Sequence, residues 1–383
     1  MIFSCGMSLW AKDFGLVLDQ DLVPSGIGND TTFDYTGILI PRFSTMLGDN
    51  AGLYISAGIN YQNNPWTVVP ELLRTEFYWR FSNNEFKVGR MQYSDPLGYI
   101  ANGLFDGVSF SVDTQAGTLS AGAWYTGLLY KKRANISMTQ DELQSITDGL
   151  DYSDFFNTYA APKRGIAALN WEQPGIKERV DLYASLLGQF DFSGANLHSQ
   201  YAVVRAAVPV NDFIFNLGGC LELMENSGDF GFGLAGELGV DWMLPTKIED
   251  RLSLVGRFSS GNFENSSMNA FLPITTVAQG DLFQAKLSGI STITLDYLGR
   301  FYRTLSAGIS STYFIRSDLN TCTLIGNDGY FAGNEFYGRL MWSPVSDIMA
   351  YLGGGVFLPS LGNAAPNANM QWRVELNVII SLY

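Results

Sequence analysis

Residues 370–383 read MQWRVELNVIISLY, and their alternating pattern is the key to the fold of the chain. Its even positions from Trp372 to Leu382 are all apolar, whereas its odd positions from Gln371 to Asn377 are polar or charged. Because a β-strand turns successive side chains to opposite faces, the pattern predicts a strand with one apolar and one largely hydrophilic face. In a soluble sandwich the apolar face would meet a core. In a transmembrane barrel it would meet lipid, and the polar face would line a lumen.

The same alternation continues along the whole chain. Between residues 53 and 62, for example, Leu53, Ile55 and Ile59 share one face, and Ser56 and Asn60 share the other. We therefore predict an all-β fold of about eighteen strands. The strands are expected near residues 13–23, 33–47, 53–62, 72–82, 85–94, 106–114, 119–130, 164–173, 179–191, 199–209, 213–225, 231–244, 251–260, 281–298, 304–316, 334–343, 348–358 and 370–383.

The connections between these strands alternate in length. Every second one is short, as at 83–84 and 344–347, and the others are mostly longer. The longer connections are expected at 24–32, 63–70, 134–163, 261–280 and 319–333. Short periplasmic turns and long extracellular loops are typical of transmembrane antiparallel up-and-down β-barrels. An even number of strands would place both chain ends at the periplasmic rim.

The composition supports a membrane barrel. The chain of 383 residues contains 41 glycines, 14% aromatic residues and 16% charged residues, and it has no apolar run long enough for a spanning helix. The net charge of −14 argues against nucleic acid as a partner. No linker divides the sequence, so we predict a single barrel domain over residues 12–383.

Four tryptophans give an independent indication. Trp79, Trp171, Trp242 and Trp342 each lie just before a short turn, on the apolar parity of the strand. The indole ring prefers the interface between lipid headgroups and hydrocarbon, so we expect these side chains at the membrane interface. Chance placement in a soluble sandwich is the alternative.

The pattern resembles the larger Gram-negative porins, including the carbohydrate- and anion-specific channels and the alginate-export type. Residues 86–98, FKVGRMQYSDPLG, followed by 103–108, GLFDGV, look like strand–loop–strand pieces of those proteins. The resemblance implies an outer-membrane location, with membrane lipid and the barrel-assembly machinery as partners and a homo-oligomer as a possible assembly. It implies passive diffusion of small solutes as the activity.

Strand parity places most charged residues of the strands on the inward face. The predicted pore-lining residues are Arg42, Arg74, Glu76, Arg80, Arg164, Arg205, Glu222, Glu237, Arg257, Lys286, Arg316, Arg339 and Arg373. Inward placement avoids a cost of about 2–4 kcal/mol for each Arg or Lys at the lipid midplane. Two interpretations stay open: a wall of salt-bridged charges that only keeps the barrel wet and stiff, or an arginine strip that binds anionic or hydroxyl-rich solutes.

Other functions find little support in the sequence. The GxGxxG pattern from Gly231 to Gly236 lies inside one alternating strand, with no helix after it to receive a pyrophosphate. His198 is the single histidine and is expected in a loop, so we predict no catalytic site, no metal and no cofactor. Two rival functions stay open: a transporter of hydrophobic solutes and a surface adhesin displayed on a barrel.

The first residues and the cysteines lie outside this pattern. Residues 1–11, MIFSCGMSLWA, look like the remnant of a cleaved signal peptide, and a lipoprotein box around Cys5 is the alternative. Cys5, Cys220 and Cys322 lie far apart and predict isolated thiols.

The longest connection, residues 131–163, predicts structure of its own. A Thr cap, early acidic residues and a closing Gly predict a short helix over 139–149. Tyr152, Phe155, Phe156 and Tyr159 follow it. We expect this loop to fold inward, dock these aromatics on the inner wall and narrow the pore; a cap on neighbouring outer loops is the alternative.

Overall fold

The structure is a computed structural model that describes residues 12–63, 66–176, 179–263, 266–319 and 329–383. The expected signal-peptide remnant at residues 1–11, together with Cys5 and Cys322, lies outside the described residues. Those interpretations therefore stay predictions. Cys220 is a buried free thiol.

The described residues form one sheet of eighteen strands. The strands are β1 (Lys12–Ile27), β2 (Asp30–Met46), β3 (Ala51–Asn63), β4 (Trp66–Phe81), β5 (Asn84–Ser94), β6 (Asn102–Thr114), β7 (Gly117–Tyr125), β8 (Arg164–Ile176), β9 (Val180–Asp191), β10 (Leu197–Val210), β11 (Phe213–Asn226), β12 (Asp229–Met243), β13 (Arg251–Ser259), β14 (Ile290–Tyr302), β15 (Leu305–Arg316), β16 (Phe331–Val345), β17 (Ile348–Leu358) and β18 (Gln371–Leu382).

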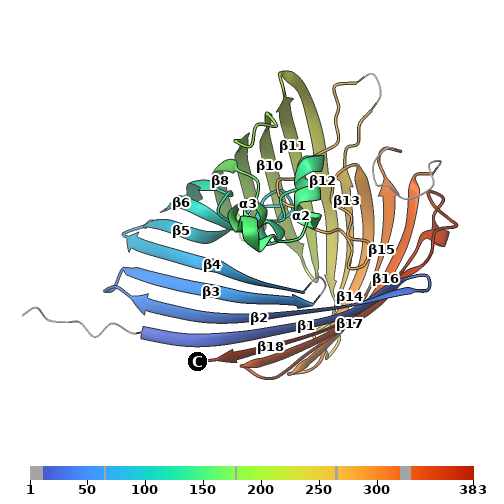
Figure 1. Ribbon diagram of the computed structural model, residues 1–383, viewed down its shortest axis with the longest axis horizontal. Coiled ribbons are helices and arrows are strands. Elements are labelled where there is room, and N and C mark those ends of the chain that lie inside the picture. The colour runs from blue at the N-terminus through green and yellow to red at the C-terminus, as the bar shows by residue number, and fades with distance from the viewer. Residues whose placement is uncertain (1–11, 64–65, 177–178, 264–265, 320–328) are drawn as a thin grey trace, which may run out of the picture.

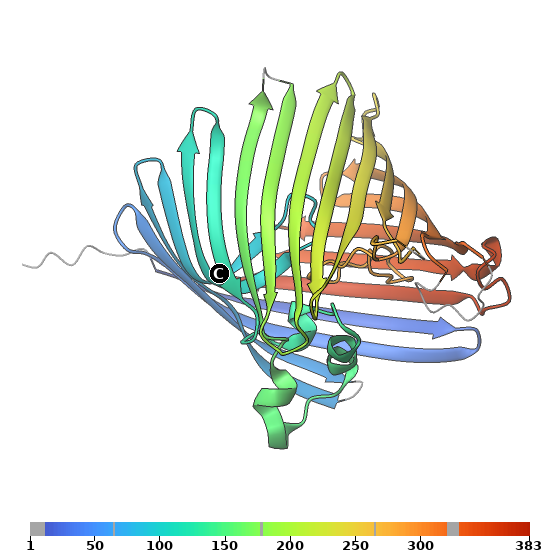
Figure 2. The ribbon, with the colours of Figure 1, turned by 90° about the horizontal axis from the view of Figure 1, so that it is seen from above.

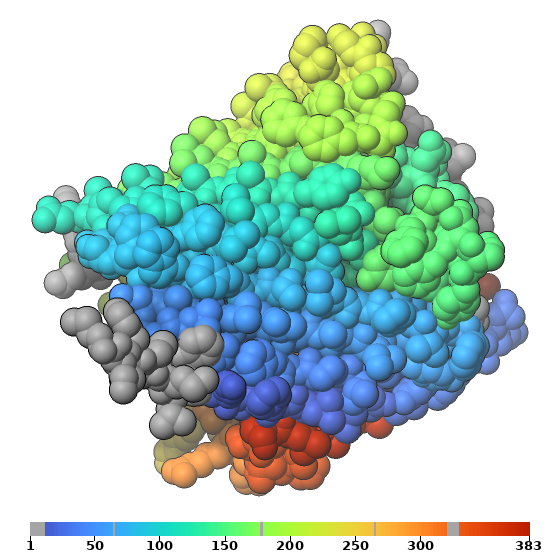
Figure 3. Space-filling model, turned by 60° about the vertical axis from the view of Figure 1, so that its left-hand side comes forward, coloured from blue at the N-terminus to red at the C-terminus, as the bar shows by residue number. Residues whose placement is uncertain are grey.

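Each strand pairs antiparallel with its sequence neighbours, and β1 also pairs with β18, so the sheet closes into a barrel (Figures 1 and 2). In the closing pair Leu16 lies opposite Leu382, and Ile27 lies opposite Gln371. The space-filling view shows β1, in dark blue, bordered by the red end of the chain (Figure 3). The predicted fold class, an antiparallel up-and-down barrel of about eighteen strands, is confirmed.

Side-chain exposure follows the predicted alternation. In β11, Leu217, Leu221 and Leu223 are 48%, 40% and 52% exposed, whereas Cys220 and Glu222 are 5% and 0% exposed. The outer wall is therefore apolar, and the polar side chains of the strands point to the interior.

The two rims differ as expected. The rim that holds the chain ends has connections such as 82–83, 115–116, 211–212 and 346–347, and we call it the short-turn rim. The opposite, long-loop rim carries the longest connections, which are 126–163, 260–289, 317–330 and 359–370.

Two loops expected at the long-loop rim are strand instead. β1 continues to Ile27 and β2 begins at Asp30, with Gly28 (φ +60°) in the turn between them. The residues 24–32 have the composition of a loop, but pairing with β2 and β18 keeps Pro24 to Ile27 extended. β4 likewise begins at Trp66, earlier than predicted.

A third correction concerns β14. It begins at Ile290, so the first residues of the predicted strand 281–298 belong to the 260–289 loop. Lys286 therefore reaches the interior from a loop and not through strand parity.

The helices are short and lie in the long-loop connections. They are α1 (Lys131–Ala134), α2 (Gln140–Thr147), α3 (Phe155–Tyr159) and the 3-10 turns η1 (Tyr152–Asp154) and η2 (Pro359–Leu361). The predicted helix at 139–149 is confirmed as α2, where Thr139 and Glu142 form a capping box. Among the described residues, no helix is long and apolar enough to cross a membrane.

Candidate solute pathway

Three segments of the long-loop rim enter the barrel and pack on its inner wall. They are residues 95–101 after β5, part of the 126–163 loop, and the 260–289 loop. The ribbon views show the helices of the 126–163 loop at the barrel mouth, and the 260–289 loop running between the walls (Figures 1 and 2). We call these three segments together the inner plug.

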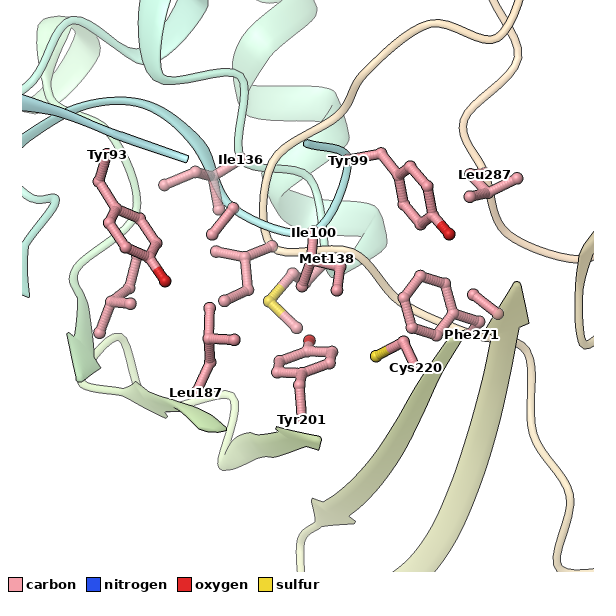
Figure 4. Packing of buried hydrophobic residues seen from close by; sticks show 14 of the residues in the cluster. Tyr93, Tyr99, Ile100, Ile136, Met138, Leu187, Tyr201, Cys220, Phe271 and Leu287 are labelled. Carbon is pink, nitrogen blue, oxygen red and sulfur yellow. The ribbon is translucent and has the colours of Figure 1, made fainter. Parts of the chain in front are cut away.

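An apolar core joins the inner plug to the wall. Ile100, Ile136 and Phe271, one from each segment, are completely buried. They meet wall residues such as Tyr201 and Cys220, and the close-up shows these side chains converging (Figure 4). These packed side chains therefore fill part of the barrel interior, and a solute has to pass beside them.

Backbone hydrogen bonds to Asp95 hold the first plug segment. Its carboxylate accepts from the amides of Leu97, Gly98, Ile100 and Ala101 at 2.8–3.0 Å. Burial raises the pKa of Asp95 from its ordinary value, and these four donors oppose that rise. The Asp95 carboxylate is thus stabilised by the backbone amides of its own turn.

A buried ion pair holds the second segment. Arg164 of β8 is 0% exposed, and its Nη2 lies 2.6 Å from Glu142 Oε1 on α2. The guanidinium also donates to the carbonyl of Leu197 at 3.3 Å. Arg164 thus anchors the loop and does not face a water-filled pore.

The second and third segments also bind each other. The amide of Thr276 donates to the carbonyl of Asn135, and the Asn135 amide side chain returns a bond to the Thr276 carbonyl, both at 2.8 Å. Lys286 Nζ donates to the carbonyl of Ser137 at 2.6 Å. Burial lowers the pKa of Lys286 to about 8.

Several predicted pore-lining residues lie in ion pairs along the wall. The pairs are Arg74–Glu76 at 2.7 Å, Arg80–Glu85 at 2.6 Å, Arg257–Glu237 at 2.6 Å, Arg339–Asp296 at 2.7 Å and Arg373–Glu375 at 3.1 Å. This pairing favours the first of the two interpretations, a wall of mutually neutralised charges. That these residues line a conducting pore stays a prediction.

The remaining predicted residues divide into anchors of the inner plug and guanidiniums that form no ion pair among the described residues. Arg316 is 2% exposed and donates to the carbonyl of Leu319, and Glu222 accepts from the amide of Leu272 at 2.8 Å. Arg42 lies over the Tyr383 ring at 4.2 Å. Arg205 lies 5.9 Å from the centre of the Tyr183 ring and donates to the carbonyl of Pro96 at 3.2 Å.

The sequence missed one inward carboxylate of the strands and the contact of another. A β-bulge in β4 at Leu73 shifts the parity, so Glu71 points inward, where it binds Arg133 of the 126–163 loop at 2.7 Å. Because a loop was expected at 63–70 and the strand from 72 onward, the sequence did not assign Glu71 to a strand. Glu335 of β16 was on the inward parity, but no sequence signal shows that it binds the 260–289 loop.

The cavities that the described residues form include two polar ones on the inner wall of the barrel. The larger, of about 660 Å³, lies between the wall of β18, β1 and β2 and the 260–289 loop, with Asp21, Asp34, Leu282, Gln284 and Arg373 in its lining. The second, of about 550 Å³, lies along strands β5 to β10. Its lining includes the basic residues Lys87 and Arg205, the acidic residues Glu85 and Glu172, and the polar residue Asn170.

The glycines of the GxGxxG pattern have a packing role. They lie inside β12, as predicted, and no nucleotide fold follows. A Cβ on Gly231 would lie 2.2 Å from Asn269, and one on Gly233 would lie 2.9 Å from the backbone of Phe271. The glycines thus let the 260–289 loop approach the wall closely.

The four tryptophans lie near the short-turn ends of their strands. Trp79 and Trp342 are 48% and 49% exposed, Trp242 stacks on Phe213 with ring centroids 5.7 Å apart, and Trp171 Nε1 donates to the Ala116 carbonyl. Their location at a membrane interface stays a prediction.

A closed barrel of eighteen antiparallel strands with loops folded inside is the fold of outer-membrane porins. Neither a protein-family model nor a curated protein matches the sequence. Among solved structures, the chain is similar to OccK2 (OpdF) of Pseudomonas aeruginosa in complex with glucuronate, at a TM-score of 0.68 and 13% identity. That match covers 97% of this chain and 98% of the other.

Two more porins of Pseudomonas aeruginosa are similar to the chain. OpdO matches at a TM-score of 0.65 and 13% identity over 97% of both chains. OpdK with vanillate matches at a TM-score of 0.63 and 13% identity, over 96% of this chain and 99% of that one. At these identities the likeness establishes the fold.

Proposed function

We propose that this protein is an outer-membrane channel through which small polar solutes diffuse passively. The observation that carries the proposal is the closed barrel with an apolar outer wall and polar cavities of about 660 and 550 Å³ inside. Barrels of this strand number generally leave an aqueous path, so no moving machinery is required. Outer-membrane lipid and the barrel-assembly machinery are then its partners, and a homo-oligomer is a possible assembly.

Anionic solutes are the first candidates. Arg205 lines the 550 Å³ cavity, and in the described residues no carboxylate forms an ion pair with it. A guanidinium of this kind offers directed donors for a carboxylate. The structures of OccK2 with glucuronate and OpdK with vanillate support the same class of solute.

Cationic or zwitterionic solutes are the second candidates. The larger cavity is lined by Asp21, Asp30 and Asp34, with Arg373 as its basic residue. Rings of acidic side chains favour cations in channels. A solute with both charges would find partners in both cavities.

The two rival functions are less well supported. A transporter of hydrophobic solutes needs an apolar passage, whereas the apolar side chains inside this barrel are packed against one another. A surface adhesin would use the long loops. In Figure 2 the 126–163 loop, with its helix α3, extends away from the barrel. An adhesin requires no conductance, so channel recording separates it from a porin.

The test is recording in a planar lipid bilayer. The purified protein should show stepwise ohmic currents, and its reversal potential in a KCl gradient should report the preferred sign of charge. Glucuronate added on one side should reduce the chloride current if anions are the solutes. A folded, membrane-inserted barrel without current would contradict the proposal, and a cation-selective current without block by glucuronate would favour the second solute class.

A further inference from the structure

A small hairpin lies inside the barrel beside the larger cavity. Within the 260–289 loop, Ala278 and Lys286 form an antiparallel bridge, and the amide of Gln279 donates to the Ala285 carbonyl at 2.9 Å. These contacts close residues 278–286 into a hairpin with its tip at 280–284. We call this hairpin the crossbar.

The crossbar tip is bound to β16 through one carboxylate. Glu335 of β16, 1% exposed, accepts the amides of Asp281, Leu282 and Phe283 at 2.8, 3.0 and 2.8 Å. Three successive backbone N–H groups that converge in this way form an anion-binding nest, and here the anion is part of the protein. Charge-assisted bonds of this kind are stronger than neutral ones.

Packing around the tip is equally close. The Phe283 ring stacks on Phe357 with centroids 4.6 Å apart and meets the edge of Phe314 at 5.0 Å. A Cβ on Gly280 would lie 2.6 Å from Phe314 and 2.7 Å from the Glu335 carboxylate, so the tip has room only for glycine at this position. The tip therefore occupies a fitted socket formed by β15, β16 and β17.

The crossbar forms one side of the larger cavity. Leu282 and Gln284 line this cavity together with Asp21 of β1 and Asp34 of β2. Arg373 of β18 donates to the Asp281 carbonyl at 3.3 Å, which ties the tip to a second wall. The position of the tip consequently sets how wide the space along β18, β1 and β2 can be.

We infer that Glu335 is a positioning residue that fixes the width of the solute passage by holding the crossbar tip in its socket. The inference rests on the proposed channel function. It goes beyond that function because it assigns the limiting dimension of the passage to one carboxylate, which is buried and touches no solute. Without that carboxylate the three amides lose their acceptor, and the tip gains freedom to leave the wall.

The test uses Glu335→Gln. The glutamine side chain keeps one acceptor oxygen, but its NH2 group would face the backbone N–H groups of the crossbar tip, which need an acceptor. We expect higher single-channel conductance, noisier current, and entry of larger polyethylene glycols than in the wild type. Gly280→Ala disturbs the same socket from the loop side, leaves every strand intact, and should give the same three changes. Glu335→Asp keeps the charge on a shorter side chain and should give intermediate values.

Glu76→Gln is the matched control. It removes one inward, 5% exposed carboxylate that pairs with Arg74 within β4, so it should shift ion selectivity without changing the polymer cut-off. If the wild type conducts and both Glu335→Gln and Gly280→Ala keep its conductance and cut-off, the inference is wrong. If the wild type itself carries no current, the channel proposal fails instead.

Discussion

Arg164 and Glu142 join the barrel wall to the loop that enters it, through two hydrogen bonds of 2.6 and 2.8 Å to one carboxylate oxygen. The guanidinium is fully buried. A buried pair contributes little net stability, but removal of one partner leaves an uncompensated charge that costs about 3–5 kcal/mol. Loss of either partner should therefore destabilise the docked 126–163 loop.

The first prediction tests this anchor. Arg164→Met should release the 126–163 loop, so that protease added to the barrel in detergent cuts the loop faster and the conductance rises. The double variant Arg164→Met/Glu142→Gln should recover part of the protection, because no charge is left unpaired and the glutamine oxygen can still accept from the amides of Met138 and Thr139. Arg300→Met is the control, since Arg300 pairs with Glu249 in an exposed position. Equal cleavage of Arg164→Met and wild type would contradict the anchor.

The fold could be predicted from the sequence because a barrel repeats one local rule. In every strand lipid requires an apolar outer face, so alternation of the kind seen from Trp372 to Leu382 recurs eighteen times. The predicted strand bounds were wrong where residues typical of loops are held extended by pairing with neighbouring strands. Pro24 and Gly26 suggest a loop, yet both lie opposite partners in β2.

The interior could not be predicted in the same way. Parity says which side chains point inward, and most of the predicted residues do meet interior partners, but parity cannot say what they meet. Arg164 and Arg339 look alike in the sequence, and one is sealed under a loop while the other is paired with Asp296 on the wall. These differences depend on contacts between residues far apart in the chain.

The second prediction concerns Arg205, which forms no ion pair among the described residues. Arg205→Gln should weaken block by glucuronate, because it removes a donor that faces a polar cavity. Arg339→Gln removes the same charge but leaves Asp296 bare, so it should shift ion selectivity with little change in block. Both variants should shift the reversal potential toward cations. Equal block by glucuronate in Arg205→Gln and wild type would remove this residue from the solute path.

The third prediction separates the two halves of the 126–163 loop. The expected docking of all four aromatics on the inner wall is wrong, because Phe156 is 83% exposed. Tyr152 is 55% exposed, but its hydroxyl binds the backbone of Val68 in β4. The buried apolar residues of this loop include Ile136 and Met138. Ile136→Asp should therefore raise conductance by undocking the loop, whereas Phe156→Ala should leave conductance unchanged. A change with Phe156→Ala alone would place the constriction at the mouth.

The last prediction concerns pH and Lys286. Burial lowers the pKa of this amine from 10.5 to about 8, and the nearby charges are those of Glu222, Glu142 and Arg164. Between these two values the undocked loop binds more protons than the docked one, so docking should strengthen as pH rises through this window. Below the lower value the folded state must charge a buried amine, and docking is weakest there.

Protection of the 260–289 loop from protease or from hydrogen exchange measures this effect. In the wild type, protection should increase from pH of about 7 to about 9.5. Lys286→Met replaces the amine with an apolar side chain of similar length, so the variant should be protected at both pH values and should lose the dependence. If the variant retains the wild-type slope, another group controls docking, and the buried position of Lys286 has no role in it.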